Sequence, residues 1–185
     1  MNEGDQRAGF FTQIGDYWFA YGGWRALLKS EIFWLSLMLA VVSMRIWKSA
    51  NWWQIVIETV PTLLGLSLAA LTLFLGVGSE EFRTWLAGRE SVGEVSPFKK
   101  TAAVFVHFLV IQATALLMAF LASAIYAYPV LCGFEEANNF ARPIFWALGY
   151  FFFIYALFTI LAAAFAVFEV VHWFDEFVTA KKRGP

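Results

Sequence analysis

The chain has 185 residues, of which 61% are hydrophobic and 15% are charged, and its formal net charge at pH 7 is −1. Soluble domains contain about 45–50% apolar and about 25% charged residues, so this composition excludes an ordinary soluble globular domain. The apolar segments are continuous, whereas the strands of a membrane barrel would read as short alternating segments. We therefore expect an all-α, polytopic membrane protein.

Residues 1–30 form the first expected element, an amphipathic segment at the membrane interface. Aromatic side chains alternate loosely with polar and glycine positions there. Tyr and Trp favour the headgroup layer, so this pattern predicts an N-terminal interfacial helix, broken near Gly22 and Gly23. The alternative interpretation is that these rings pack beneath the helix bundle as ordinary core.

Four membrane-spanning helices are expected next, at about residues 31–49, 52–78, 99–128 and 143–170. Three stretches without a charged residue, 59–78, 101–134 and 143–168, support the last three of them. Each stretch reaches the roughly 20 helical residues that a bilayer core requires. The first span is shorter and ends near Arg45. The fourth helix is expected to continue to residue 178, so a cytoplasmic extension would project beyond the membrane.

Basic residues indicate how these helices are oriented. Ten of the thirteen Lys and Arg residues fall in the N-terminal segment, the connection 79–100 and the basic tail 179–185. Lys and Arg are retained on the cytoplasmic side of a membrane. Four spans put all three regions on one side, whereas three spans would split them. We therefore expect both termini and the loop 79–98 in the cytoplasm.

The connection between the second and third spans is expected to contain a short surface helix. Ser79 suits its N-cap, acidic residues follow in the first turn, and apolar residues recur at helical spacing up to Gly88. Pro97 then suits the first turn of the third span.

Two charged residues lie inside the expected spans. Arg45 and Glu58 should share a depth on adjacent antiparallel helices, which predicts an ion pair between them, because an unpaired charge there is costly. This pair would either shape the mouth of a pore or fasten the first two helices. Pro61 lies one turn further inside, where its missing N–H group predicts a kink.

Further polar residues are candidates for gating or for binding a partner. His107 and Gln112 lie in the third span, where His107 would serve either as a gate or proton relay or as an interhelical hydrogen-bonding group. The extension of the fourth helix would offer a surface for partner docking, or a simply solvated helix end. Its polar side chains are Glu169, His172, Asp175 and Glu176.

Small and polar residues line one side of each long span, as close packing of membrane helices requires. The sequence leaves open whether these stripes meet within one chain or between subunits. They comprise Gly65 and Ala69 in the second span, Gln112, Ala115, Ala119, Ala122 and Ser123 in the third, and Gly149, Ala156, Thr159, Ala163 and Ala166 in the fourth.

Motifs for catalysis are absent from the sequence. It contains no glycine-rich phosphate loop, no HExxH motif and no serine–histidine–acid arrangement at readable spacing. Cys132 is the single cysteine, so a disulfide within this chain is excluded. We therefore expect no enzymatic activity, cofactor, metal or direct nucleic-acid binding.

The segments 61–70 (PTLLGLSLAA) and 74–83 (FLGVGSEEFR) resemble a pattern in small uncharacterised bacterial multi-pass membrane proteins. That pattern is a Pro-Ser/Thr-Leu-Leu-Gly-Phe-Ser helix followed by a Gly/Asp-Glu-x-Phe boundary, with Leu66 here in the place of Phe. Some such proteins are encoded beside phage-defence systems, including retrons and CRISPR accessory modules, and are regarded as membrane effectors. The resemblance implies a bacterial inner-membrane location and carries over no catalytic or binding residue.

Three functions are compatible with these observations. The first is a non-enzymatic effector, a homo-oligomer that permeabilises or depolarises the membrane when a cytoplasmic sensor protein or nucleoprotein activates it. The second is an anchor or adaptor that regulates a soluble partner. The third, a small transporter or membrane enzyme, depends only on Glu58, His107, Glu169 and His172.

Overall fold

A computed structural model describes residues 9–48, 51–76, 78–88, 95–127 and 135–183, and these ranges contain eight helices and no strand. Cys132 lies outside the described residues. In chain order the helices are α1 (Phe10–Tyr21), α2 (Gly23–Lys29), α3 (Glu31–Val42), α4 (Met44–Lys48), α5 (Trp52–Gly76), α6 (Glu80–Ala87), α7 (Pro97–Ala127) and α8 (Glu135–Arg183).

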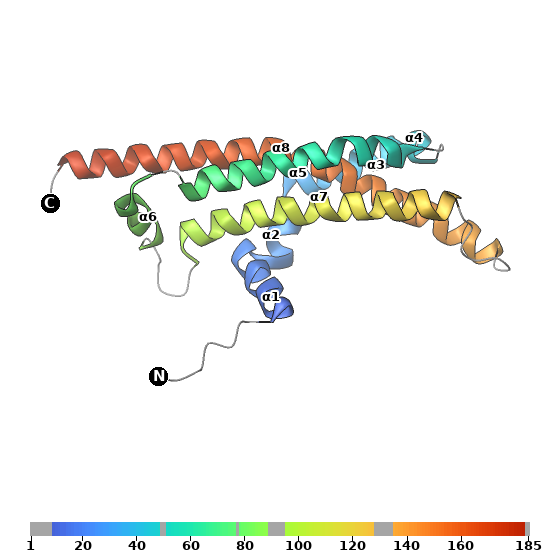
Figure 1. The fold of residues 1–185 in the computed structure, drawn as a ribbon, viewed down its shortest axis with the longest axis horizontal. Helices are drawn as coiled ribbons and strands as arrows, with labels where there is room; N and C mark the ends of the chain where they lie inside the picture. The colour runs from blue at the N-terminus through green and yellow to red at the C-terminus, as the bar shows by residue number, and fades with distance from the viewer. Residues whose placement is uncertain (1–8, 49–50, 77, 89–94, 128–134, 184–185) are drawn as a thin grey trace.

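The long helices α5, α7 and α8 pack side by side and form the body of the molecule (Figure 1). Each is long and apolar enough to cross a membrane. With 49 residues, α8 is about 74 Å long and exceeds any bilayer. It begins at Glu135, so Pro143, where we expected the helix to start, lies inside it. The all-helical architecture and three of the expected spans are thus confirmed.

The apolar surfaces of these helices are largely uncovered. In their most apolar windows only 22%, 44% and 33% of the residues are buried inside the molecule, for α5, α7 and α8 respectively. Large side chains such as Leu73, Leu117 and Phe165 are more than half exposed. A water-soluble monomer rarely exposes such continuous apolar area. Lipid is therefore the solvent that suits this surface, and the fold is that of a helical membrane protein.

The segment expected to form the first span is divided at Ser43 into α3 and α4. The 12 residues of α3 cover only about 18 Å. The indole N–H of Trp47 donates to the carbonyl of Ala40 at 2.9 Å, which satisfies an acceptor near the break. The chain then reverses at Asn51, which has a positive φ of 80°.

Helix α3 packs against α8 and adds a further helix to the bundle of α5, α7 and α8. We expected the first two membrane segments, α3 and α5, to be neighbours, but α7 and α8 are the main partners of α5. The ring of Phe33 contacts Phe151 and Tyr155 on α8. The first span therefore neighbours the fourth and not the second, whereas the consecutive helices α5, α7 and α8 do pack on one another.

Helix α1 crosses the long helices steeply and packs against α7 (Figure 1). It ends at Gly22, whose φ of 103° lies in the left-handed region and whose N–H donates to the carbonyl of Phe19. Gly23 also has a positive φ, 62°. Glycine adopts these angles without steric cost, so the predicted break at Gly22–Gly23 is confirmed.

The predicted surface helix is α6, and it lies against α7 and α8. The hydroxyl of Ser79 accepts from the backbone N–H of Phe82, as an N-cap does. Phe82 and Leu86 are 2% and 1% exposed, so the apolar face of α6 is buried. Helix α7 begins at Pro97, as predicted.

Candidate functional site

The candidate site lies where α1 crosses α7, around the imidazole of His107, which is only 2% exposed. Its Nε2 atom lies 2.9 Å from the hydroxyl of Tyr155 on α8, and its Nδ1 atom lies 3.4 Å from the hydroxyl of Tyr17 on α1. The ring of Tyr21 stacks on the imidazole with centroids 4.0 Å apart. We call these four residues the Tyr–His cluster, and it joins three helices.

The hydroxyl groups of the cluster also bond to one another. Tyr21 and Tyr155 share a side-chain hydrogen bond. Burial raises the pKa of both Tyr17 and Tyr21 above the ordinary tyrosine value, so both hydroxyl groups keep their protons at neutral pH. A neutral imidazole donates through one nitrogen and accepts through the other. The cluster can therefore satisfy His107 on both sides without any ion.

A second polar group lies deeper in the bundle, around Gln112 on α7, which is 0% exposed. Its Nε2 atom donates to the hydroxyl of Ser67 on α5 at 2.8 Å and to that of Thr159 on α8 at 2.9 Å. Thr159 in turn donates to the carbonyl of Ala156 at 2.6 Å. We call Gln112, Ser67 and Thr159 the Gln112 cluster, and it ties the three long helices together.

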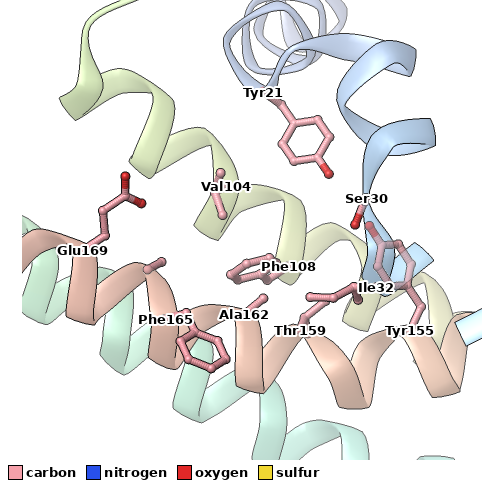
Figure 2. Close-up of a pocket in the computed structure, with 11 residues that line it drawn as sticks. Tyr21, Ser30, Ile32, Val104, Phe108, Tyr155, Thr159, Ala162, Phe165 and Glu169 are labelled. Atoms are coloured by element: carbon pink, nitrogen blue, oxygen red, sulfur yellow. The ribbon is translucent and has the colours of Figure 1, made fainter. Parts of the chain in front are cut away.

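Helix α8 connects the two clusters, because Tyr155 and Thr159 lie one helical turn apart on the same face. Buried polar groups thus extend from α1 at the edge of the bundle to its middle. The side chains of Tyr21, Tyr155 and Thr159 also line a cavity of about 360 Å³ between α1, α7 and α8 (Figure 2). Glu169 lies at the other end of this cavity.

The structure does not bring Arg45 and Glu58 together. Arg45 lies on α4 and Glu58 on α5, both side chains are exposed, and no ion pair joins them in the part of the chain that the structure describes. The physical reason is the packing of α3 and α4 on α8, away from α5. Helix α5 continues through Pro61 without ending there.

The end of α8 carries the residues expected to dock a partner, and Glu169, His172, Asp175 and Glu176 are all exposed. His172 and Glu176 form a pair at 3.6 Å. Beyond them, Lys181 bonds to Glu81 on α6 at 2.5 Å. Lys181 lowers the pKa of the Glu81 carboxyl, chiefly through this hydrogen bond.

Rings of α6 and α8 hold this end of the molecule together. Phe82 on α6 contacts Phe174 and Phe177 on α8, with centroids 5.2 and 5.5 Å apart. Helix α6 and the end of α8 therefore form one unit next to the bundle. Whether a partner binds there stays a prediction.

The sequence indicated His107 and Gln112, and it placed Thr159, a partner of Gln112, on the packing stripe of the fourth span, but it did not indicate which tyrosines bond to His107. The aromatic pattern of residues 1–30 favours the headgroup layer for Tyr17 and Tyr21, with packing beneath the bundle as the alternative, and the structure places both side chains against His107 of α7. Their spacing of four residues places them on one face of α1, and a buried tyrosine hydroxyl requires a hydrogen-bonding partner. Two tyrosines on one helix face, each needing a hydrogen-bonding partner if buried, were the sequence signal for a contact between α1 and a polar residue of the bundle. The partner Tyr155 carried no comparable signal, because it lies within a run of apolar residues.

The residues proposed for a transporter do not converge. Glu58 lies on α5, His107 on α7, and Glu169 and His172 one turn apart on α8, and of the four only His107 is buried. Within the described ranges, no group of three or more His, Cys, Asp and Glu side chains is arranged to hold a metal ion. No protein-family model, curated protein or solved structure matches the chain. The class of protein is therefore inferred from its fold and its exposed apolar surface alone.

Proposed function

We propose that this chain is a non-enzymatic membrane effector that permeabilises or depolarises a bacterial inner membrane when a cytoplasmic partner activates it. The observation that carries this proposal is the Tyr–His cluster. Through it, a helix at the edge of the bundle is bonded to buried polar groups that continue towards the middle. Release of α1 would remove Tyr17 and Tyr21 from His107 and admit water to these groups.

The membrane arrangement that we propose has four crossings, with α3 and α4 together as the first. Residues 31–48 cover about 27 Å in helical form, close to the roughly 30 Å of a bilayer core. The distribution of basic residues supports cytoplasmic termini. The steep angle between α1 and the long helices (Figure 1) supports an α1 that runs roughly parallel to the membrane plane, at the depth of His107.

An oligomer is part of this proposal, because one small-residue face is not used within the chain. An added Cβ atom at Gly65 would meet nothing within 4 Å, and Ala69, one turn away, is exposed. Small residues spaced in this way allow membrane helices to approach closely. Gly65→Leu is expected to weaken association in detergent, as measured by light scattering, and an unchanged mass would contradict this role of α5.

The proposed activity can be tested by loosening α1. Tyr21→Ala removes the stacking on His107 and the contacts of a half-buried ring. This should lower the free energy needed to release α1 by about 2 kcal/mol, which multiplies the population with α1 released by about 30. We expect cells that express this variant to depolarise without a trigger, as reported by a potential-sensitive dye. Phe19→Ala is the matched control, because Phe19 lies on the same helix and is 74% exposed.

Two results would refute the proposal. One is an intact membrane potential in cells that contain membrane-inserted Tyr21→Ala at the wild-type level. The other is equal depolarisation by Tyr21→Ala and Phe19→Ala, because the effect would then come from expression and not from α1 release. The resemblance of residues 61–83 to effectors beside phage-defence systems supports phage infection as the trigger to test first.

A second function, that of a membrane anchor for a soluble partner, is favoured by the unit formed from α6 and the end of α8. The Glu81–Lys181 bond and the ring contacts of Phe82 hold this unit in a fixed arrangement. A stoichiometric soluble partner that copurifies with the chain, lost in Lys181→Glu and accompanied by no change in membrane potential, would favour this function over the first.

A further inference from the structure

A groove between α7 and α8 continues from the Tyr–His cluster to the beginning of α7. It consists of two adjoining cavities of about 360 and 280 Å³. Val104, Ala166 and Glu169 line both cavities, so the two are parts of one groove. Such elongated grooves between helices of a bundle are typical places for small-molecule ligands.

The inner part of this groove suits hydrocarbon. Its walls include Val104, Phe108 and Phe165. Apart from Glu169 at its outer end, polar side chains that line it have partners inside the protein, because Thr159 donates to a backbone carbonyl and Tyr155 bonds to His107. The hydroxyl of Ser30 accepts from a backbone N–H at the start of α3. An alkyl chain would therefore leave none of these groups newly unpaired.

The outer part of the groove carries two opposite charges. Lys100 on α7 and Glu169 on α8 line the same cavity beside Trp173. Both charged side chains are exposed, and within the described residues neither takes part in an ion pair. Figure 2 shows the Glu169 side chain extending from α8 towards the side where α7 lies. A ligand with both a negative and a positive group would satisfy both residues.

The length of the groove matches one membrane leaflet. From Tyr155 to Glu169 the helix rises about 21 Å, and half of a bilayer including its headgroups is about 20–22 Å thick. A lipid whose tail reached Tyr155 would place its headgroup beside Glu169 and Lys100. Trp173 at this level agrees with the preference of tryptophan for the headgroup layer.

From this geometry we propose that the groove binds one phospholipid with a zwitterionic, primary-amine headgroup. Lys100 binds the phosphate and Glu169 accepts hydrogen bonds from the ammonium group, while one alkyl chain lies between α7 and α8. An anionic headgroup without an amine leaves Glu169 unpaired, and a quaternary ammonium group cannot donate hydrogen bonds to it. The site therefore distinguishes phosphatidylethanolamine from phosphatidylglycerol and phosphatidylcholine.

The inference rests on the membrane location of the chain and not on the proposed permeability. The experiment is native mass spectrometry of the purified protein with equal amounts of the three lipids. We expect one phosphatidylethanolamine per chain, preferred by about fivefold, the size of one partly exposed charge pair. Glu169→Gln should abolish the preference, and Lys100→Gln should weaken the binding of all three lipids. Glu58→Gln and Lys99→Gln, both at exposed residues outside the groove, should change nothing.

A steric variant provides an independent readout. Ala166→Phe fills the part that both cavities share and should remove the bound lipid. Ala164→Phe is its matched control, because Ala164 is exposed on the same helix and lines neither cavity. Variants are compared after their helical circular dichroism has been shown to equal that of the wild type. Equal binding of the three lipids, a preference for phosphatidylglycerol, or retention of lipid by Ala166→Phe would each overturn the proposal.

Discussion

The packing of α5 against α8 can be tested at Gly149 on α8, which lies directly beside the ring of Trp52 on α5. An added Cβ atom at Gly149 would lie 2.6 Å from Cη2 and 3.2 Å from Cζ2 of Trp52. Carbon atoms in contact are normally about 3.5–4.0 Å apart, so the ring would have to move by about 1 Å. Trp52 is only 2% exposed and packs edge-on against Trp53 and Tyr150. The ring therefore has no free space to enter.

We predict that Gly149→Ala destabilises the protein relative to Gly65→Ala by about 1–3 kcal/mol, the usual cost of overpacking a core. Gly65 is the matched control, because an added Cβ atom there meets nothing within 4 Å. Both substitutions gain about 1 kcal/mol in helix propensity. This gain cancels in the comparison, so the difference isolates the clash with Trp52.

The measurement is unfolding by SDS in mixed micelles, followed by far-ultraviolet circular dichroism at a concentration where the protein is monomeric. Gly149→Ala should unfold at lower SDS than Gly65→Ala. Equal midpoints for the two variants, or a lower midpoint for Gly65→Ala, would refute the packing of Gly149 on Trp52.

Two further predictions concern polar contacts. Gln112→Leu removes the bonds to Ser67 and Thr159. An interhelical hydrogen bond in a membrane protein contributes about 0.6–1.7 kcal/mol, so the free energy of unfolding in the same SDS assay should fall by about 1–3 kcal/mol. Unchanged stability would contradict the Gln112 cluster. Because the pKa of Glu81 is lowered by Lys181, their bond should contribute at neutral pH and be lost as the pH falls through that lowered pKa. Carbon NMR should show the Glu81 carboxyl titrating below the usual glutamate value of about 4.3 in the wild type and near it in Lys181→Gln, and identical titrations would contradict the bond.

Local signals predicted much of the fold. Long uncharged runs indicated the three helices of membrane length, and Gly22–Gly23, Ser79 and Pro97 marked a helix break, an N-cap and a helix start. These features depend on backbone preferences that a few neighbouring residues determine. The division at Ser43 was not predictable in this way, because no glycine or proline marks it.

The order of helices in the bundle was not predictable from the same signals. In lipid, apolar faces do not select their partners, and close packing of particular side chains decides which helices meet. The expected Arg45–Glu58 pair assumed that the first two membrane segments are adjacent. The contacts of Phe33 with α8 show why that assumption failed.

The candidate site was predicted only in part, because its bonds join residues far apart in the chain. His107 and Gln112 were identifiable as polar residues in an apolar helix. Tyr17 and Tyr155 contact His107 across 90 and 48 residues, and no local pattern encodes such pairings.

The most direct test of the account measures ion leakage from liposomes that contain only the purified protein. We predict that wild-type chain and Phe19→Ala leave the liposomes sealed, whereas Tyr21→Ala releases a trapped dye or collapses an imposed potassium gradient without any partner. Sealed liposomes for all three proteins, each shown to be inserted and helical, would contradict control of the membrane barrier by α1 and His107.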